Sequence, residues 1–425
     1  MSSTVTTDLL DPWLDATCKG FPQGSAPVRR SAVGAQGWNI LTGDLPLPLA
    51  VLKRAELSHN IGWMQHYANA AGISFAPHGK TSMSPQLFQR QLEAGAWGLT
   101  FATVNQARIG AEAGARRILI ANQVLSAADL QGIVALRRDY AGLQLIFLLD
   151  SEAQLHAIET AAPGQDFEVL LELGHANGRT GCRDLATALA LARAIHASQH
   201  LRLLGIECYE GLLAKGDDAA DRAQARALMQ QVSELAVLCE EQGLFDTSDI
   251  IISAGGSAIF DLVVPQLRLQ LQRPVTGLLR SGCYVTHDHG FYKRMVGRVN
   301  HRLACDDGLR AALEVWALVQ SQPEPGLAIL AVGKRDISYD LDLPVPIAHC
   351  PREVLEVRAA PEGWRITGLN DQHAHLRWPE GAAVPAIGDR VALGISHPCT
   401  TFDKWRWMPI VDADYRVVDA LITAF

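Results

Sequence analysis

The segment LQLIFLLD, residues 143–150, decides the fold class of this chain. Its continuous apolar run, Leu145–Leu149, is typical of a strand that is buried on both faces of a parallel sheet, and the polar Asp150 follows at once. Similar short runs, rich in β-branched residues, recur on both sides of it. They predict eight strands in all: Ile73–Pro77, Gly98–Ala102, Arg117–Ala121, Leu143–Leu149, Phe167–Leu173, Leu203–Cys208, Ile250–Ala254 and Val275–Leu279.

Longer amphipathic segments separate these runs. Several are rich in Ala, Leu, Gln and Arg with apolar residues at three- and four-residue spacing, which predicts helices at Pro85–Ala96, Ala127–Tyr140, Asp184–Ser198 and Ala219–Gln242. A repeated strand–helix order requires parallel pairing through right-handed crossovers. Eight such units within about 200 residues favour an α/β fold of the (β/α)8 TIM-like barrel type. An open doubly wound sheet stays an alternative, because the first and last strands have the weakest patterns.

The sequence changes character after about residue 300. Short alternating runs, broken by Gly, Pro, Asn and Asp, predict antiparallel strands and turns at Ala311–Gln320, Leu327–Val332, Glu353–Arg358, Trp364–Gly368 and Arg390–Ile395. We therefore expect a barrel over residues 48–298 followed by a β-rich C-terminal domain over residues 299–425. Residues 1–47 have little periodicity and are expected to form an arm that packs with the β-rich domain.

Composition excludes several classes of function. The 425 residues carry a net charge of −8 with no basic block, so a nucleic acid is not an expected partner. No apolar run approaches about 18 residues, as a transmembrane helix needs, and the N-terminus lacks the apolar region of a secretory signal. The eight cysteines are scattered without a CxxC pair, which is typical of reduced thiols in the cytoplasm. We expect a cytoplasmic enzyme that does not bind a membrane.

Polar residues follow the carboxyl ends of the expected strands, which is where (β/α)8 barrels gather their chemistry. They are Lys80, Thr103, Asn122, Asp150, Arg179, Tyr209, the turn Gly255-Gly256-Ser257, and Arg280. Chain segments after strands are commonly polar in any case, so position alone does not make these residues functional.

The turn Gly255-Gly256-Ser257 precedes a run, Ala258–Gln272, that we expect to be helical. Backbone amides at a helix N-terminus, uncovered by glycine, form a cradle for an anion, and barrels commonly hold phosphate after the seventh strand. The alternative is a tight turn that needs a positive φ.

Lys80 follows the first expected strand, beside Gly79. A lysine there is a candidate for a Schiff base, because burial lowers its pKa and makes the amine a nucleophile. The alternative is a surface lysine.

His397 and Cys399 are separated by one residue on an expected extended segment, which directs both donors to the same face. Imidazole and thiolate are the ligands of zinc, although two ligands do not complete a site, and a buried cysteine beside a turn histidine is the alternative. The cluster His287-Asp288-His289 is a weaker metal candidate, because adjacent His and Asp side chains of a strand point to opposite faces. His373 and His375 form a third cluster, whose spacing favours turn residues over metal ligands.

These residues, taken in order, give a resemblance to the pyridoxal-phosphate enzymes of the alanine racemase fold, fold type III. The chain is most similar to the branch that contains D-serine dehydratase and D-threonine aldolase, over roughly residues 45–410. The specific element is Pro77-His-Gly-Lys-Thr81. The other segments are Leu57–Ile61, Gly98–Thr103 with Gln106-Ala107, Gly178–Gly181, Gly205–Gly211, Ser253–Ser257, Arg280–Gly282, Asp371–His373 and Ser396–Thr400.

The resemblance implies a set of residues that bind pyridoxal 5'-phosphate. Lys80 forms the Schiff base, Arg179 donates to the phenolic oxygen, and Tyr209 contacts the ring. Arg280 faces the pyridine nitrogen. The phosphate is bound by Gly255, Gly256 and Ser257 and by the backbone amides of Gly282 and Cys283.

The resemblance also implies a metal at His397 and Cys399, which with Lys80 are the expected catalytic residues. A thiolate favours zinc, whereas a carboxylate in place of the cysteine favours manganese or magnesium. Similar dehydratases have His-x-Cys here and similar aldolases have His-x-Asp. The expected activity is therefore dehydration of a D-3-hydroxy amino acid such as D-serine to a 2-oxo acid and ammonia.

Three alternatives stay open. One is retro-aldol cleavage of a D-threonine-like substrate to glycine and an aldehyde, with His373 as a candidate base. Another is a racemase, in which the metal pair has no task. The third is a non-catalytic pyridoxal-phosphate carrier, against which the long C-terminal domain argues. By resemblance, the substrate is a small D-amino acid and the chain forms a homodimer.

Overall fold

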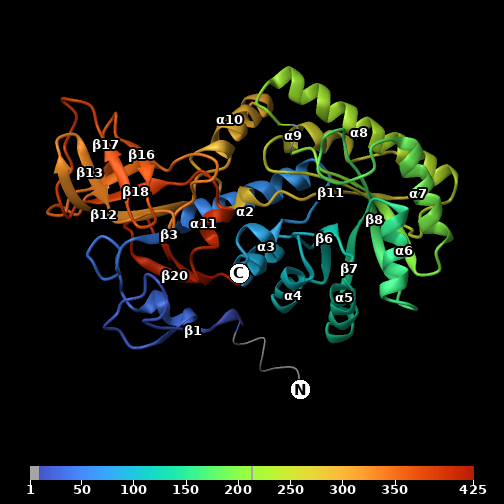
Figure 1. Ribbon diagram of the computed structural model, residues 1–425, viewed down its shortest axis with the longest axis horizontal. Coiled ribbons are helices and arrows are strands. Elements are labelled where there is room, and N and C mark those ends of the chain that lie inside the picture. Colours follow the sequence, from blue (N-terminus) through green and yellow to red (C-terminus); the bar gives the residue numbers. More distant parts are fainter. Residues whose placement is uncertain (1–8, 212–213) are drawn as a thin grey trace.

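A computed structural model describes residues 9–211 and 214–425. It contains a parallel barrel and an antiparallel sheet domain that lie side by side, with the barrel on the right of Figure 1 and the sheet domain on the left. The helix α10 (Phe291–Leu303) leads the chain from one to the other. The short helix α11 (Cys399–Phe402) returns from the sheet domain toward the barrel.

The barrel has the eight strands that the sequence predicts. Their order in the parallel sheet is β4-β11-β10-β9-β8-β7-β6-β5. The bounds are β4 (Ser74–Phe75), β5 (Leu99–Phe101), β6 (Arg117–Gln123), β7 (Gln144–Leu149), β8 (Phe167–Leu173), β9 (Leu201–Cys208), β10 (Ile250–Ala254) and β11 (Val275–Leu279). The two ends of the sheet meet through a parallel bridge between His78 and Thr100, with the Thr100 amide donating to the Pro77 carbonyl at 2.9 Å. The prediction of a barrel is confirmed.

Alternation along the strands explains why a continuous apolar run is needed. On β7, Ile146 and Leu148 belong to a small cluster inside the barrel, whereas Leu145, Phe147 and Leu149 belong to the larger core outside it. Successive side chains of a strand point to opposite faces, so a strand with an apolar environment on both sides must be apolar throughout.

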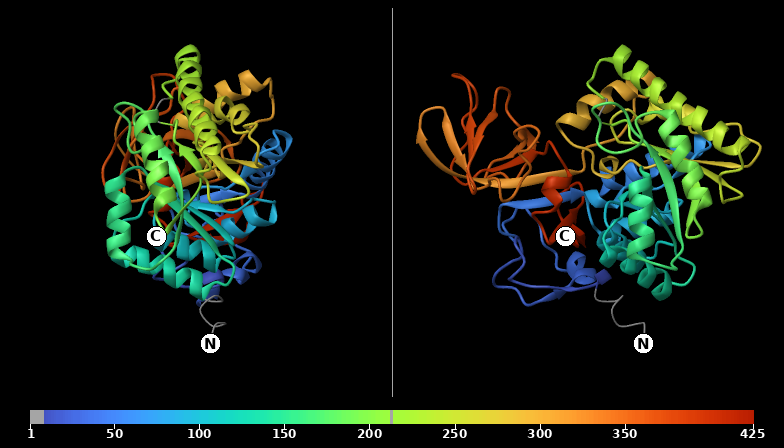
Figure 2. Two further views of the ribbon diagram at one scale, coloured as in Figure 1. Left: turned by 90° about the vertical axis from the view of Figure 1, so that its right-hand side faces the viewer. Right: turned by 45° about the vertical axis from the view of Figure 1, so that its right-hand side comes forward.

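Helices surround the barrel, as the two rotated views in Figure 2 show. They are α2 (Arg54–Ala70), α3 (Pro85–Glu93), α4 (Val104–Glu112), α5 (Ala127–Asp139), α6 (Glu152–Ala161), α7 (Leu185–Ala197) and α8 (Asp218–Glu241). Side chains of Thr103, Ser126, Ser151, Asp184 and Asp217 cap five of them by accepting a backbone N–H of the first turn. The four predicted helices lie within a few residues of their expected bounds.

One predicted helix is wrong. Ala258–Gln272 is not a single helix: α9 (Phe260–Val263) is followed by a 3-10 turn, η3 (Val264–Gln266). Pro265 explains the break, because proline has no N–H for the helical hydrogen bond and its ring clashes with the preceding turn. The glycine turn at 255–256 is therefore not at the N-terminus of a long helix.

The C-terminal domain is an antiparallel sheet with one parallel contact. Its strands are β12 (Leu313–Glu324), β13 (Leu327–Leu330), β14 (Val345–Cys350), β15 (Arg358–Ala359), β16 (Arg365–Leu369), β17 (Ala374–Arg377), β18 (Arg390–Gly394), β19 (Trp407–Val411) and β20 (Val417–Ile422). The predicted strand Glu353–Arg358 is wrong, because only Arg358 and Ala359 pair with β14. Residues 352–354 form a turn, in which the Arg352 amide donates to Asp389 at 3.0 Å.

The chain upstream of the barrel joins this domain. Strand β3 (Leu49–Lys53) pairs antiparallel with β12 and parallel with β19. The short hairpin β1 (Trp13–Leu14) and β2 (Val28–Arg29) leads into a 3-10 helix, η1 (Arg30–Ala35), which packs on β20. Across residues 9–211 and 214–425, no helix combines the length and the apolar character that crossing a membrane demands.

Candidate active site

Lys80 lies in a 3-10 turn, η2 (Gly79–Thr81), directly after the first barrel strand. Gly79 allows this turn to sit against the aromatic core, since a Cβ there would lie 2.4 Å from Phe101 Cε1. The Lys80 side chain is exposed by area, yet protein atoms crowd it, and this desolvation lowers its pKa. Attraction to Cys399 and Cys283 opposes this lowering of the pKa, and repulsion by Arg179 and Arg280 reinforces it.

The C-terminal domain reaches this turn through α11, which packs against η2. The Sγ atom of Cys399, at the start of α11, lies 3.5 Å from Thr81 Oγ1. It also lies 3.8 Å from the Sγ atom of Cys283, in the turn η4 (Cys283–Val285) after β11. Residues that are far apart in the sequence, at 80, 283 and 399, thus meet where the barrel and the sheet domain join.

His397 is held by a carboxylate that the sequence did not indicate. Its Nδ1 lies 2.6 Å from Asp340 Oδ2, and Thr400 Oγ1 donates to the other Asp340 oxygen at 2.6 Å. A hydrogen bond to Cys399, followed by the Asp340 contact, raises the pKa of His397 to about 9. Asp340 is remote from the His-x-Cys pair and lies in a loop without periodicity, so no local signal could have identified it.

The two thiols share one hydrogen-bonding system. A hydrogen bond from Cys283 and another from His397 hold the pKa of Cys399 well below its ordinary value. The same contact with Cys399 raises the pKa of Cys283. Cys399 is therefore the more readily deprotonated of the two cysteines.

The corner where His397, Cys399 and Cys283 lie (the metal corner) has donor atoms that suit a divalent metal. A histidine whose other ring nitrogen is bound by a carboxylate is the usual arrangement behind a metal-binding imidazole, and Cys399 already favours the thiolate that binds metals. As the side chains stand, no group of three His, Cys, Asp or Glu residues in the described ranges converges to hold a metal ion. The predicted ligands His397 and Cys399 stay a prediction.

Arg179 and Tyr209 meet at the carboxyl ends of β8 and β9. The Arg179 guanidinium carbon lies 5.0 Å from the centre of the Tyr209 ring, within cation–π range. Burial raises the pKa of Tyr209 to about 12, which keeps its hydroxyl protonated at neutral pH.

Arg280 is buried beneath this corner. Its Nε donates to Ser253 Oγ at 2.7 Å and its Nη2 donates to the Cys208 carbonyl at 3.0 Å and to the Glu207 carboxylate. Burial raises the pKa of Glu207 to about 8, against the opposing effect of Arg280. Sequence reasoning missed Glu207, although it lies two residues before Tyr209 on a predicted strand. Whether Arg280 contacts a pyridine nitrogen stays a prediction.

The amides of the glycine turn are occupied in this structure. The Gly255 and Gly256 amides donate to the two carboxylate oxygens of Glu210, at 3.0 and 2.8 Å. Gly255 has φ +129°, so the tight-turn explanation of this glycine holds. Any phosphate bound by these amides must share or displace Glu210, whereas Ser257 lies outside that contact. The phosphate role of these three residues stays a prediction.

Gly282 and Cys283 pass close to the lysine turn. A Cβ on Gly282 would lie 2.8 Å from both the His78 carbonyl oxygen and Thr81 Oγ1. Nearby, the buried Nδ1 atom of His78 has no hydrogen-bond partner. The Gly282 backbone therefore lies near a buried nitrogen that has no partner, and these polar atoms are available to a bound group.

The weaker histidine clusters have other surroundings. Asp288 caps α10, accepting the amides of Gly290 and Lys293 at 2.9 and 3.0 Å. Beside it, His287 is buried and His289 is half-buried. His375 contacts Asn370 at 3.0 Å, and His373 is exposed in the preceding turn.

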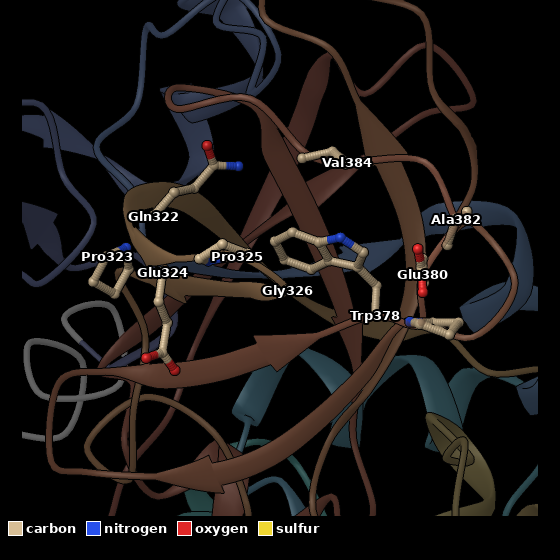
Figure 3. Close-up of a pocket in the computed structure, with 11 residues that line it drawn as sticks. Gln322, Pro323, Glu324, Pro325, Gly326, Trp378, Glu380, Ala382 and Val384 are labelled. Atoms are coloured by element: carbon tan, nitrogen blue, oxygen red, sulfur yellow. The ribbon is translucent and has the colours of Figure 1, made fainter.

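A hollow of about 780 Å³ lies elsewhere, in the sheet domain (Figure 3). It is bordered by the β12–β13 turn around Pro325 and by Trp378, Glu380 and Val384. None of the predicted site residues lines it, so its size does not identify the active site.

The residues around Lys80 fit pyridoxal phosphate. An amine with a lowered pKa suits Schiff-base chemistry, and Lys80, Arg179 and Arg280 bring positive charge to one place, which suits a phosphorylated ligand. The fold and this site together define a fold-type III pyridoxal-phosphate enzyme with a second, β-rich domain.

Comparisons with known proteins agree. Residues 52–274 match the family model described as "Alanine racemase, N-terminal domain", and residues 312–411 match the one described as "Putative serine dehydratase domain". The chain therefore belongs to the alanine racemase N-terminal domain family.

Its relatives are lyases of D-3-hydroxy amino acids. The chain is 28% identical to D-threonine aldolase of Arthrobacter sp, over 84% of this chain and 86% of the relative. It is also 28% identical to D-threo-3-hydroxyaspartate dehydratase of Delftia sp. (strain HT23), over 84% and 92%. Among solved structures, a cysteine-to-alanine variant of D-threo-3-hydroxyaspartate dehydratase, in the metal-free form, has a TM-score of 0.72 and 25% identity, covering 91% of this chain and 99% of that one.

Proposed function

We propose that this protein is a pyridoxal-phosphate- and zinc-dependent dehydratase that converts a D-3-hydroxy amino acid such as D-serine to a 2-oxo acid and ammonia. One observation carries the proposal: the Cys399 thiolate, with His397 beside it, lies against the turn that holds Lys80. This proximity supports a mechanism in which an amine and a soft metal-binding pair act on neighbouring atoms of one small substrate.

Each side chain has a task in this proposal. When bound, pyridoxal phosphate supplies the electron sink that makes the α-proton of an amino acid removable, and a divalent metal supplies Lewis acidity at the β-hydroxyl. Lys80 binds the cofactor and, as a free amine, takes the α-proton at Nζ. His397 and Cys399 hold the metal, and Asp340 fixes the orientation of the His397 ring. Arg179, Tyr209 and Arg280 orient the cofactor.

Cys399 favours dehydration over cleavage. A thiolate and an imidazole select zinc, whereas a carboxylate at this position would suit manganese or magnesium. The alanine variant of the dehydratase relative that was solved in a metal-free form replaces a cysteine, which is consistent with a cysteine ligand in that enzyme. The loss of the β-hydroxyl is the step that such a metal assists.

The competing function is retro-aldol cleavage to glycine and an aldehyde, which the aldolase relative favours. It needs a base for the β-hydroxyl proton. His373, the candidate from the sequence, is exposed, and within residues 9–211 and 214–425 no hydrogen bond or ion pair of its side chain connects it to Lys80 or His397. Racemisation would leave His397 and Cys399 without a task.

We also propose a cytoplasmic homodimer. All eight cysteines are free thiols, as expected in a reducing compartment. Exposed apolar residues near the metal corner, Tyr339, Leu341, Leu343 and Val345, are a surface that a second copy could cover.

The test is the reaction itself. Purified protein loaded with pyridoxal phosphate and zinc is incubated with D-serine and with D-threo-3-hydroxyaspartate, and 2-oxo acid and ammonia are quantified. Activity should be lost in Cys399→Ala while the absorbance of the bound cofactor is kept. Cys305→Ala, which removes a half-buried thiol after α10, should match wild type. Full activity of Cys399→Ala in a preparation shown to be free of metal would refute the metal role.

A further inference from the structure

Two thiols from different domains lie side by side at the proposed metal corner. Cys283 follows the last barrel strand and Cys399 opens α11, and their sulfur atoms are 3.8 Å apart. Both remain free thiols, well beyond the S–S bond length of about 2.05 Å. The motif that suggests a metal contains only His397 and Cys399, so nothing in the sequence connects Cys283 to it.

The separation of the two sulfur atoms matches an edge of a zinc tetrahedron. Zinc binds thiolate sulfur at about 2.3 Å with tetrahedral angles, which places two such sulfurs about 3.8 Å apart. The observed 3.8 Å therefore needs no further approach of the two cysteines.

The surrounding structure holds both cysteines in place. Next to Cys283, Tyr284 is buried and its hydroxyl accepts a hydrogen bond from Gln91 at 2.9 Å. On the other side, Thr81 Oγ1 lies 3.7 Å from the Cys283 sulfur and 3.5 Å from the Cys399 sulfur. The Thr81 hydroxyl therefore contacts both sulfur atoms from the side of the lysine turn.

The charges around this corner are also compatible with a zinc ion bound by two thiolates. Lys80, Arg179 and Arg280 face this corner, and the attraction between Lys80 and each of the two cysteines is among its main electrostatic contacts. Zinc with two thiolates and a neutral imidazole carries no net charge, so it does not add to the positive charge already present.

We propose that Cys283 is a third zinc ligand, completing with Cys399 and His397 a two-cysteine, one-histidine site that leaves one tetrahedral position open for the substrate's β-hydroxyl. Three protein ligands and one open position are the pattern of catalytic zinc sites, two cysteines and one histidine included. The inference rests on the proposed function, because it assumes that zinc binds at His397 and Cys399.

In the described residues His397 is not yet in position as the third ligand, because no three donor side chains there converge to hold a metal ion. The cysteine edge is already at its final spacing, so the adjustment falls on His397. Its Nδ1 is held by Asp340, which leaves Nε2 as the donor that must come within zinc distance. The half-buried His397 side chain must therefore move for that atom to reach zinc.

The test counts sulfur atoms around zinc. X-ray absorption spectroscopy at the zinc edge is recorded on the reduced protein loaded with one zinc and with pyridoxal phosphate. We expect two sulfur neighbours at about 2.3 Å in wild type and one in Cys283→Ser, which keeps the backbone amide. Cys305→Ser, which removes a thiol outside the site, should keep both.

Zinc affinity provides the second readout. Loss of an outer partner of a metal ligand costs about 10- to 100-fold in affinity, so loss of a ligand in Cys283→Ser should cost at least about 100-fold. One sulfur neighbour in wild type would overturn the inference, and so would wild-type affinity with two sulfurs in Cys283→Ser. In either case, if Cys399→Ser loses zinc while Cys283→Ser keeps it, the proposed function still stands. A wild-type protein that binds no zinc would refute both the proposed function and the role of Cys283. If Cys283→Ser does not fold, the wild-type sulfur count decides.

Discussion

Asp340→Asn is the substitution that most sharply tests how the metal corner is built. In the structure the Asp340 carboxylate accepts a hydrogen bond from His397 Nδ1 at 2.6 Å and one from Thr400 at 2.6 Å. Asparagine has the same shape, and its amide oxygen still accepts from the imidazole, but the charge is gone. Charge-assisted hydrogen bonds are roughly twice as strong as neutral ones, so the ring is held less firmly and its other nitrogen is a weaker donor.

The magnitude follows from the contact and its exposure. Outer partners of metal-binding histidines are worth about 10- to 100-fold in metal affinity, or about 1.4 to 2.8 kcal/mol. The Asp340 side chain is 39% exposed, which screens its charge and places the expectation at about tenfold. Zinc affinity is measured by competition with a chelator at pH 9, near the raised pKa of His397, where protonation of the ring lowers the affinity only about twofold.

The matched control is Asp342→Asn in the same loop. Asp342 pairs with Arg294 at 3.0 Å on the surface and does not contact His397, so its replacement should leave zinc affinity unchanged. An Asp340→Asn protein that binds zinc within twofold of wild type, or an equal loss in Asp342→Asn, would refute the role assigned to Asp340.

Two further predictions concern stability. Gly282→Ala should destabilise the fold by about 1 to 3 kcal/mol in urea unfolding, because the new Cβ lies 2.8 Å from Thr81 Oγ1. The control Gly297→Ala, in open space on α10, should be neutral or stabilising. Equal effects of the two substitutions would contradict the packing argument. Burial lowers the pKa of His287 to about 4 and that of His289 to about 3, so the unfolded chain binds more protons than the native one below about pH 6.5. The free energy of unfolding should therefore fall by about 1 kcal/mol per histidine between pH 7.5 and 5.5. In His289→Gln the part of this loss that comes from His289 should disappear. An unchanged pH dependence of stability in this variant would contradict the burial argument.

The barrel was predictable because its physical signal is local. A strand such as Leu145–Leu149 must be apolar at every position to lie between an inner and an outer core, and that requirement is written in consecutive residues. The helix expected over residues 258–272 failed for an equally local reason, since Pro265 interrupts it. The strands β14, β17, β19 and β20 were not predicted. In β14, Pro346 and His349 interrupt the alternation of apolar and polar residues, and β17 has only four residues.

The candidate site was only partly predictable. Lys80, His397 and Cys399 could be proposed from motifs, whereas the 3.8 Å approach of Cys283 to Cys399 joins residues 116 positions apart. Nor does the sequence indicate that Asp340 lies against His397, or that Glu210 accepts the amides of Gly255 and Gly256. These contacts depend on how the sheet domain packs on the barrel and on the loop after β9, and neither leaves a periodic pattern.

The most direct measurement identifies the products formed from D-threonine, because a dehydratase and an aldolase convert this substrate to different products. The purified protein, with pyridoxal phosphate and zinc, is incubated with D-threonine with and without a chelator, and the products are identified. We predict 2-oxobutyrate and ammonia in equal amounts, both lost on metal removal and restored by zinc. Glycine and acetaldehyde in their place would contradict the central claim and make this protein an aldolase.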